Sequence, residues 1–98
     1  MKVNINSVHF KTDSKLDTFI NEKLQKLSSI YDGLIGSEVI LKVSNDGDDE
    51  NKIAEIRLII KGADLFAKKK CRTFEEATDS AIEALRKQLK KHKEKLKI

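Results

Sequence analysis

The sequence predicts an α+β fold of the order β-α-β-β-β-α, in which a four-stranded mixed sheet carries both helices on one face. Two segments repeat apolar side chains at helical spacing, and four shorter segments alternate apolar and polar residues. Because each predicted element has one apolar side, the economical packing is a two-layer structure. A chain of 98 residues has room for one domain, which we expect to span residues 1–98.

The first strand and the first helix are predicted from the opening third of the chain. Val3 and Ile5 indicate a strand, with Val8 as an imperfect continuation of the alternation. A helix is predicted over residues 13–30, because Thr12-Asp13-Ser14 offers an N-cap and Asp32-Gly33 can end the helix, with Gly33 in a left-handed turn. Its apolar stripe comprises Leu16, Phe19, Ile20, Leu24 and Leu27.

Three further strands are predicted in the middle of the chain. A second strand over residues 37–44 and a third over 54–60 flank the segment 45–51, which is too charged to pack and is therefore a hairpin loop. A tight turn at 62–64 leads into a fourth strand over 65–71. We expect a right-handed crossover to make the first two strands parallel, and the remaining strands to form an antiparallel meander.

A long second helix is predicted to close the chain. Thr73 and Glu76 match a capping box at its start. The apolar stripe that follows comprises Phe74, Ala77, Ala81, Ile82, Leu85, Leu89 and Leu96. A helix of about 22 residues would reach about 33 Å, so its last turns should project past the core.

Positive charge is concentrated in the second helix. Residues 86–98 hold seven basic residues and one acid, whereas residues 1–85 hold 13 bases and 15 acids. The seven bases lie along two flanks of the predicted helix: Arg86, Lys90, Lys93 and Lys97 on one, and Lys87, Lys91 and Lys95 on the other. Solubility does not require such an excess, and a concentrated positive field is typical of a protein that binds a polyanion.

Further basic residues occur in the first helix and after the fourth strand. Lys23 and Lys26 are predicted near the end of the first helix, and Lys68, Lys69, Lys70 and Arg72 form a third group. The aromatic residues Phe10, Phe19, Phe66 and Phe74 are expected largely in the core, so no platform for stacking single-stranded bases is visible. We therefore expect contacts to phosphates, read through shape as in structured RNA.

The sequence offers little for catalysis or metal binding. Asp46, Asp48, Asp49 and Glu50 lack the spacing of a calcium loop and are interpreted as a solvated hairpin tip. His9, His92 and Cys71 match no ligand spacing, and Cys71 is interpreted as an inert thiol. The acids Glu75, Glu76, Asp79 and Glu83 complement the helix dipole, and the four glycines stand apart. We expect no catalytic activity, metal, cofactor or small-molecule substrate.

The compartment is predicted from what the sequence lacks. The N-terminus has no apolar signal region, and no run approaches the roughly 18 apolar residues of a membrane helix. Cys71 is the single cysteine and cannot form an internal disulfide, which fits a reducing compartment. We expect a cytoplasmic protein that does not associate with membranes.

The end of the second helix, Gln88-Leu89-Lys90-Lys91-His92-Lys93-Glu94-Lys95-Leu96, resembles the C-terminal signature of the ribosome hibernation-promoting factors. The segment Glu22-Lys23-Leu24-Gln25-Lys26-Leu27 and the order of elements are also similar to that family. The resemblance covers the whole chain and implies a stress or stationary-phase factor that silences translation and stores ribosomes. Such a factor binds the rRNA of the small ribosomal subunit in the channel of the mRNA and of the A-site and P-site tRNAs.

The resemblance also implies site residues and partners. The rRNA-facing residues would be Lys23, Lys26, Arg86, Lys87, Lys90, Lys91, His92, Lys93 and Lys95, with Lys68, Lys69, Lys70 and Arg72 as candidates for an additional RNA contact. Because the chain stops at Ile98, it is similar to the short members, which help a second factor to dimerise ribosomes, rather than to the tailed inhibitor A subgroup. We expect a monomer when the protein is off the ribosome.

Two other functions fit the same pattern. A double-stranded RNA-binding domain shares a helix, three strands and a helix, although the extra first strand and the basic end of the second helix argue against it. A protein-interaction module could instead use the long basic helix as a docking surface.

Overall fold

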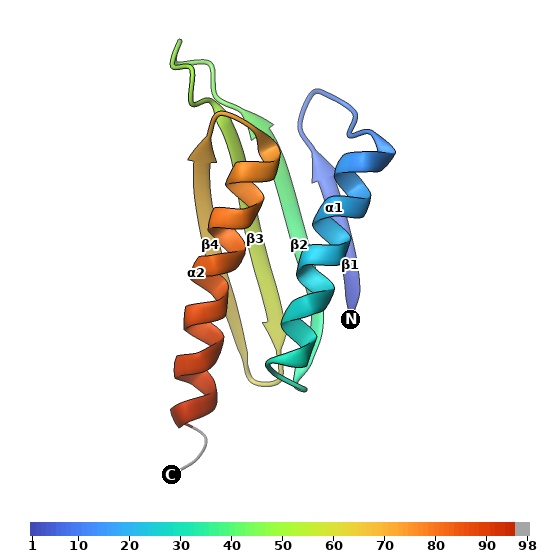
Figure 1. The fold of residues 1–98 in the computed structure, drawn as a ribbon, viewed down its shortest axis with the longest axis vertical. Coiled ribbons are helices and arrows are strands. Elements are labelled where there is room, and N and C mark those ends of the chain that lie inside the picture. The colour runs from blue at the N-terminus through green and yellow to red at the C-terminus, as the bar shows by residue number, and fades with distance from the viewer. Residues whose placement is uncertain (96–98) are drawn as a thin grey trace.

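The computed structural model describes residues 1–95 and confirms the predicted order of elements. The strands are β1 (Lys2–Ser7), β2 (Leu34–Val43), β3 (Lys52–Ile60) and β4 (Ala63–Cys71). The helices are α1 (Ser14–Gln25), the short 3₁₀ helix η1 (Lys26–Ser29) and α2 (Phe74–Lys95). Figure 1 shows both long helices on the same face of the sheet, as predicted.

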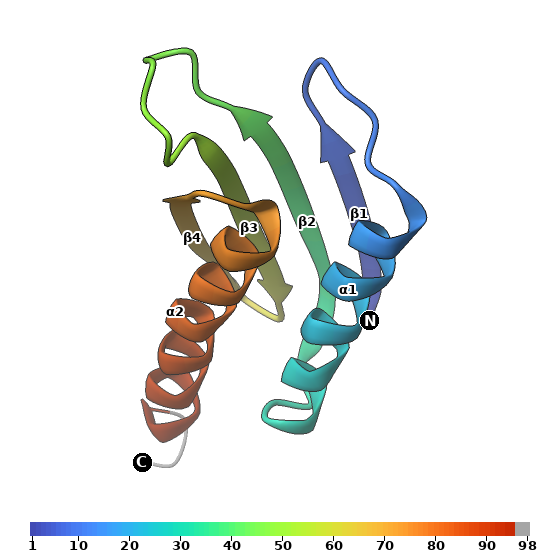
Figure 2. The same cartoon turned by 45° about the horizontal axis from the view of Figure 1, so that its top comes forward.

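The sheet has the mixed topology that the sequence predicts. Its strand order is β1-β2-β3-β4, with β1 parallel to β2 and the other neighbours antiparallel. One register row runs across all four strands through Ile5, Val39, Ile56 and Ala67. Because side chains alternate along a strand, this row and every second residue from it along each strand face the helices. No helix of residues 1–95 lies on the other face of the sheet (Figure 2).

The core lies between this sheet face and the two helices. Leu24 and Leu27 from α1 and η1, and Leu85 and Leu89 from α2, are at most 1% exposed. Since the helices bury only one stripe each, their other sides are free to carry charge.

Side-chain caps start both helices at the predicted places. The Leu16 N–H donates to Asp13 Oδ1 at 2.7 Å, and the Glu76 N–H donates to Thr73 Oγ1 at 3.1 Å. Each bond satisfies one of the backbone donors that a helix start leaves free.

The end of the first helix differs from the prediction. The α-helical part stops at Gln25, and η1 follows it, because the Ser28 and Ser29 hydroxyls donate to the carbonyls of Gln25 and Lys26 at 2.5 and 2.7 Å. Gly33 does not adopt the predicted left-handed conformation. The Tyr31 ring instead occupies the space where a side chain at position 33 would lie.

Three strands begin earlier than predicted, and the prediction for one aromatic residue is wrong. Backbone pairing extends past the apolar alternation: β2 begins at Leu34, β3 at Lys52, and β4 at Ala63, after a turn in which Gly62 has a φ of +83°. Phe66 was expected in the core but is 47% exposed. It lies between two helix-facing residues of β4 and must therefore point to the uncovered face.

The molecule is elongated, with extents of 47 × 24 × 18 Å. The C-terminal end of α2 extends past the turn between β3 and β4, as predicted, and the loop 45–51 lies at the opposite end of the long axis (Figure 1). Leu96 and Lys97, predicted to continue the helix, lie outside the described residues. In the described part of the chain, neither helix has the length and apolar character needed to span a membrane.

Candidate nucleic-acid interface

The side of α2 that faces α1 changes its charge halfway along the helix. Glu76, Asp79 and Glu83 are followed by Arg86, Lys90 and Lys93, all spaced by three or four residues and therefore on one side. The acids lie near the positive end of the helix dipole, and the bases lie near its negative end. This side of α2 thus has an acidic first half and a basic second half.

A second row of bases broadens the cationic surface. Lys87 and Lys91 lie next to the first row, and the side chains of Arg86, Lys87, Lys90, Lys91 and Lys93 are all exposed. Lys95 is in the last described turn of α2. We call the surface formed by Arg86, Lys87, Lys90, Lys91 and Lys93 the basic helix end.

The two predicted lysines of the first helix lie beside the basic helix end. Lys23 Nζ is 3.4 Å from Asp79 Oδ1 and 5.4 Å from the centroid of the Phe19 ring, so it bridges α1 and α2. Lys26 is exposed at the start of η1. Lys23, Lys26 and Arg86 help to line a groove of about 620 Å³ between the helices, whose floor includes Leu27 and Ile82.

Two contacts hold the end of α2 against the rest of the protein. The His92 ring meets the Tyr31 ring edge-on, with 5.5 Å between centroids, and Lys93 Nζ donates to the Ile30 carbonyl at 3.4 Å. His92 is half-buried by this contact, so its role is partly structural. The contacts orient the basic helix end although it extends beyond the sheet.

The third predicted group, residues 68–72, is separated from the basic helix end. β4 runs antiparallel to α2, which places this group near the start of α2 (Figure 1). Lys68 and Lys70 belong to the uncovered face of the sheet, and Lys69 belongs to the helix-facing side. Exposed Arg72 follows the end of the strand.

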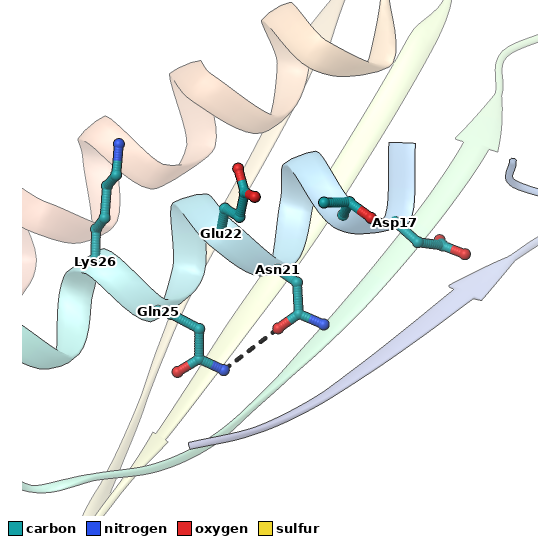
Figure 3. Close-up of a pocket in the computed structure, with 6 residues that line it drawn as sticks. Asp17, Asn21, Glu22, Gln25 and Lys26 are labelled. Atoms are coloured by element: carbon teal, nitrogen blue, oxygen red, sulfur yellow. Dashed lines mark hydrogen bonds between the residues drawn. The ribbon is translucent and has the colours of Figure 1, made fainter. Parts of the chain in front are cut away.

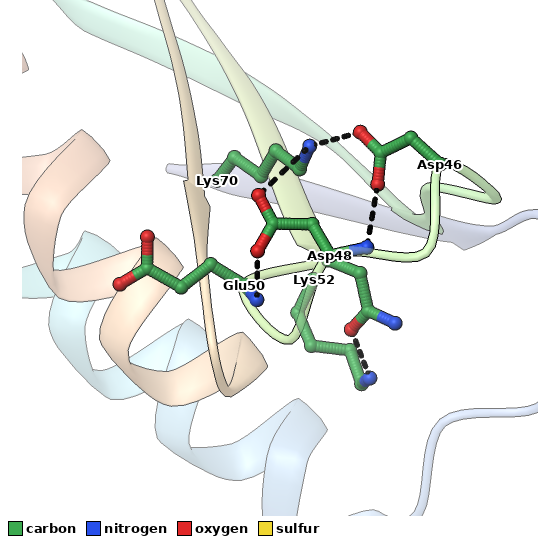
Figure 4. A network of polar contacts seen from close by, with 6 residues as sticks. Asp46, Asp48, Glu50, Lys52 and Lys70 are labelled. Atoms are coloured by element: carbon green, nitrogen blue, oxygen red, sulfur yellow. Dashed lines mark hydrogen bonds and ion pairs between the residues drawn. The ribbon is translucent and has the colours of Figure 1, made fainter.

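Lys70 is engaged by the acidic loop (Figure 4). It pairs with Asp46 and lies 4.0 Å from Asp48. The pKa of Asp46 is lowered to about 2, chiefly by the hydrogen bond from Lys70 and further by the Asp48 N–H, and Asp46 in turn raises the pKa of Lys70. Lys70 is therefore neutralised locally and is a poor candidate for an RNA contact.

Two carboxylates of the loop, those of Asp46 and Asp48, also accept hydrogen bonds from the backbone of the loop. The Asp48 N–H donates to Asp46 Oδ1 at 3.2 Å, and the Glu50 N–H donates to Asp48 Oδ1 at 3.1 Å. Within residues 1–95 no three His, Cys, Asp or Glu side chains gather as a metal site. These bonds support the interpretation of the loop as a hairpin tip.

Two other features lack the geometry of a reactive site. Burial is the main cause that raises the pKa of the half-buried Cys71, and the negative charge of Glu76 raises it further. The thiol therefore stays protonated and weakly nucleophilic at neutral pH. Figure 3 shows a hollow on α1 beside Asn21 and Gln25. The residues that line it all belong to α1 and the first residue of η1. The Gln25 amide donates to Asn21 Oδ1 at 3.3 Å and to the Met1 carbonyl at 3.1 Å, so these polar groups already have partners.

These features define a class of protein: a two-layer β-α-β-β-β-α domain whose long helix ends in a cluster of exposed cations. Residues 3–97 match the model of the family described as Sigma 54 modulation protein / S30EA ribosomal protein, and the chain belongs to this family.

Similar proteins and structures agree with this membership. The chain is 33% identical over 95 residues to the ribosome hibernation promoting factor of Pseudomonas putida, covering 97% of this chain and 89% of that protein. It is 29% identical to the factor of the same name from Klebsiella oxytoca, covering 99% of this chain and 98% of that protein.

Two solved structures share the fold. One is a ribosomal subunit interface protein from Coxiella burnetii, with a TM-score of 0.83 and 17% identity over 95% of this chain and 98% of that one. The other is the N-terminal domain of Protein Y from Thermus thermophilus, with a TM-score of 0.82 and 19% identity over 94% of this chain and 99% of that one.

Sequence reasoning missed two features of these surfaces. The acids of α2 were interpreted only through the helix dipole, whereas Asp79 also holds Lys23 across the groove. The helical spacing of Asp79 and Arg86 was a signal that they share one side of α2. The alternation in β4 could likewise have predicted that Phe66 lies on the other face of the sheet from Leu65 and Ala67.

Proposed function

We propose that this protein is a ribosome hibernation factor of the cytoplasm that silences translation by binding rather than by catalysis. It would bind the rRNA of the small ribosomal subunit in the channel of the mRNA and of the A-site and P-site tRNAs. The observation that carries the proposal is the basic helix end, in a chain whose relatives are named ribosome hibernation promoting factors.

The basic helix end suits phosphates of folded RNA. Its five bases are exposed on a helix that backbone hydrogen bonds and core contacts keep rigid. Little backbone conformational entropy is therefore lost when RNA binds. Each lysine or arginine that meets a phosphate releases a condensed counterion, which favours binding. Lys26 extends this surface across the groove to α1. Lys23 lies on the same groove but is paired with Asp79, so it would have to exchange that partner for a phosphate.

The acidic first half of the side of α2 that faces α1 limits where RNA can bind. Glu76, Asp79 and Glu83 repel phosphates, so the RNA backbone is favoured only beside the second half of α2. A molecule with extents of 47 × 24 × 18 Å that is held in this way would occupy the channel and exclude mRNA and tRNA by volume. This is the mechanism that we propose for silencing.

Sucrose-gradient sedimentation with purified small subunits and whole ribosomes tests the proposal. The wild-type protein should sediment with both and should be displaced from neither by an excess of a long RNA duplex. Glu replacement of Lys90, Lys91 and Lys93 should abolish co-sedimentation, with circular dichroism unchanged. The same gradients show whether bound ribosomes are single or paired.

A matched control separates the site from overall charge. Lys2, Lys11 and Lys15 are exposed and lie outside the proposed surface, so their replacement by Glu makes the same change in net charge. The control variant should retain most binding. Ribosome binding by the variant of the basic helix end, with its helices intact, would refute the site. Displacement by any duplex would identify a general double-stranded RNA-binding domain instead.

A further inference from the structure

The uncovered face of the sheet holds an exposed aromatic side chain between two cations. Of the five aromatic residues, all of which lie within the described part of the chain, only Phe66 is exposed, at 47%. Arg57 is its direct register partner on β3, and Lys68 is two residues further along β4 on the same face. Directly paired side chains on neighbouring strands have Cβ atoms about 5 Å apart, so the three side chains adjoin.

The two cations beside Phe66 are available for a ligand. Neither Arg57 nor Lys68 takes part in an ion pair within residues 1–95, and both are exposed. Glu55, the register partner of Lys68, is engaged by Lys42, whose Nζ lies 2.5 Å from Glu55 Oε2. Lys68 therefore differs from Lys70, which the acidic loop neutralises.

Acids limit how far a phosphate chain could follow this face. Glu38 is the register partner of Arg57 on β2, and Asp64 lies two residues before Phe66 on β4. A run of phosphates across the sheet would meet these carboxylates. The face therefore suits one base and its flanking phosphates better than a long track of backbone.

We propose that the uncovered face of the sheet binds single-stranded RNA, with Phe66 stacking on one base and Arg57 and Lys68 contacting its flanking phosphates. An aromatic ring stacks on any base, so the contact is tolerant of sequence, and a paired base cannot reach the ring. This surface lies on the face opposite α1 and α2, and the proposal does not depend on the basic helix end.

Site-resolved NMR can distinguish this face from the basic helix end. Labelled wild-type protein is titrated with an unstructured RNA of about ten nucleotides, which is within the site size of sheet-based binders. The Phe66 ring resonances should move upfield, together with the amides of Arg57 and Lys68. The rings of Phe10 and Phe74, which stack on each other at 5.0 Å between centroids, should not move and serve as internal references.

Salt and substitutions provide the quantitative test. With two phosphate contacts, the logarithm of the affinity measured at Phe66 should fall with a slope of about −1.4 against the logarithm of the salt concentration. Phe66→Ala should weaken this binding by about 5- to 150-fold, the range for one stacked base, and Phe66→Tyr should preserve it. Val43→Ala is the control, since Val43 is 41% exposed but belongs to the helix-facing side of the sheet.

Three outcomes would overturn the proposal. The Phe66 ring could stay unmoved while only α2 resonances shift, or an RNA duplex could move it as strongly as the single strand does. Self-association of the wild-type protein that Phe66→Ala abolishes would show instead that the face pairs two copies of the chain. In each case ribosome binding through the basic helix end would be unaffected, so failure here is distinguishable from failure of the proposed function.

Discussion

Neutralising three lysines of the basic helix end should change how ribosome binding depends on salt. Lys87, Lys90 and Lys91 are the suitable set, because they are exposed and form no ion pair within the described residues. Arg86 and Lys93 are less suitable, since Arg86 lies 3.9 Å from Glu83 and Lys93 contacts the Ile30 carbonyl. Replacement by Gln removes the charge and keeps a long polar side chain.

The expected magnitude follows from counterion release. Each phosphate contact contributes about −0.9 to the slope of log affinity against log salt on a double-stranded polyanion, so three contacts contribute about −2.7. Between about 50 and 200 mM salt, the wild-type protein should therefore lose about 40-fold more affinity than the triple Gln variant loses.

Binding of fluorescently labelled protein to small subunits, measured at several salt concentrations, gives the slope directly. The control carries Gln at Lys2, Lys11 and Lys15, which changes net charge equally at other exposed positions. If the control flattens the slope as much as the test variant does, binding follows overall charge and the basic helix end has no special role. An unchanged slope in the test variant would contradict the assignment as well.

Three further predictions concern stability and chemistry. Leu85→Ala should lower the free energy of unfolding by about 2–5 kcal/mol in urea titrations, because Leu85 is fully buried; a loss below about 1 kcal/mol would contradict the packing. The folded-state pKa of Asp46, about 2, lies below its ordinary 3.8, so its contribution to stability is present above pH 4 and is lost as the pH falls through 2. Lys70→Met should bring the Asp46 pKa seen by NMR back toward 3.8, and an unchanged value would show that Lys70 is not the cause. Because burial raises its pKa, Cys71 should react with iodoacetamide more slowly in the folded protein than in urea, and equal rates would refute this.

The fold was predictable because periodicity and caps agree along the chain. The alternation through Ile56 and Leu58 and the helical stripe through Leu85 and Leu89 each fix which side is buried. Element ends were harder to predict, since they depend on partners. β2 continues to Leu34 because that residue pairs with Ile60, which no local pattern in the sequence reveals.

The candidate surface was predictable as a set of charges but not as an arrangement. Charge counts identified the bases of α2, yet only the packing of α1 against α2 brings Lys23 to Asp79. The run of Lys68 to Lys70 was treated as one group, whereas the pleat and the acidic loop give Lys68 and Lys70 different neighbours. Ion pairs between residues far apart in the chain cannot be predicted from the spacing of residues in the sequence.

The opposite placement of the acidic loop and the basic helix end has a consequence for encounter. Charges of opposite sign at the two ends of a 47 Å axis give the protein a large electric dipole moment along its length (Figure 1). The field of a polyanion exerts a torque on such a dipole and turns it before any contact is made. The protein would therefore arrive with the basic helix end leading and the 45–51 loop trailing. A larger fraction of collisions would then have the orientation needed for binding.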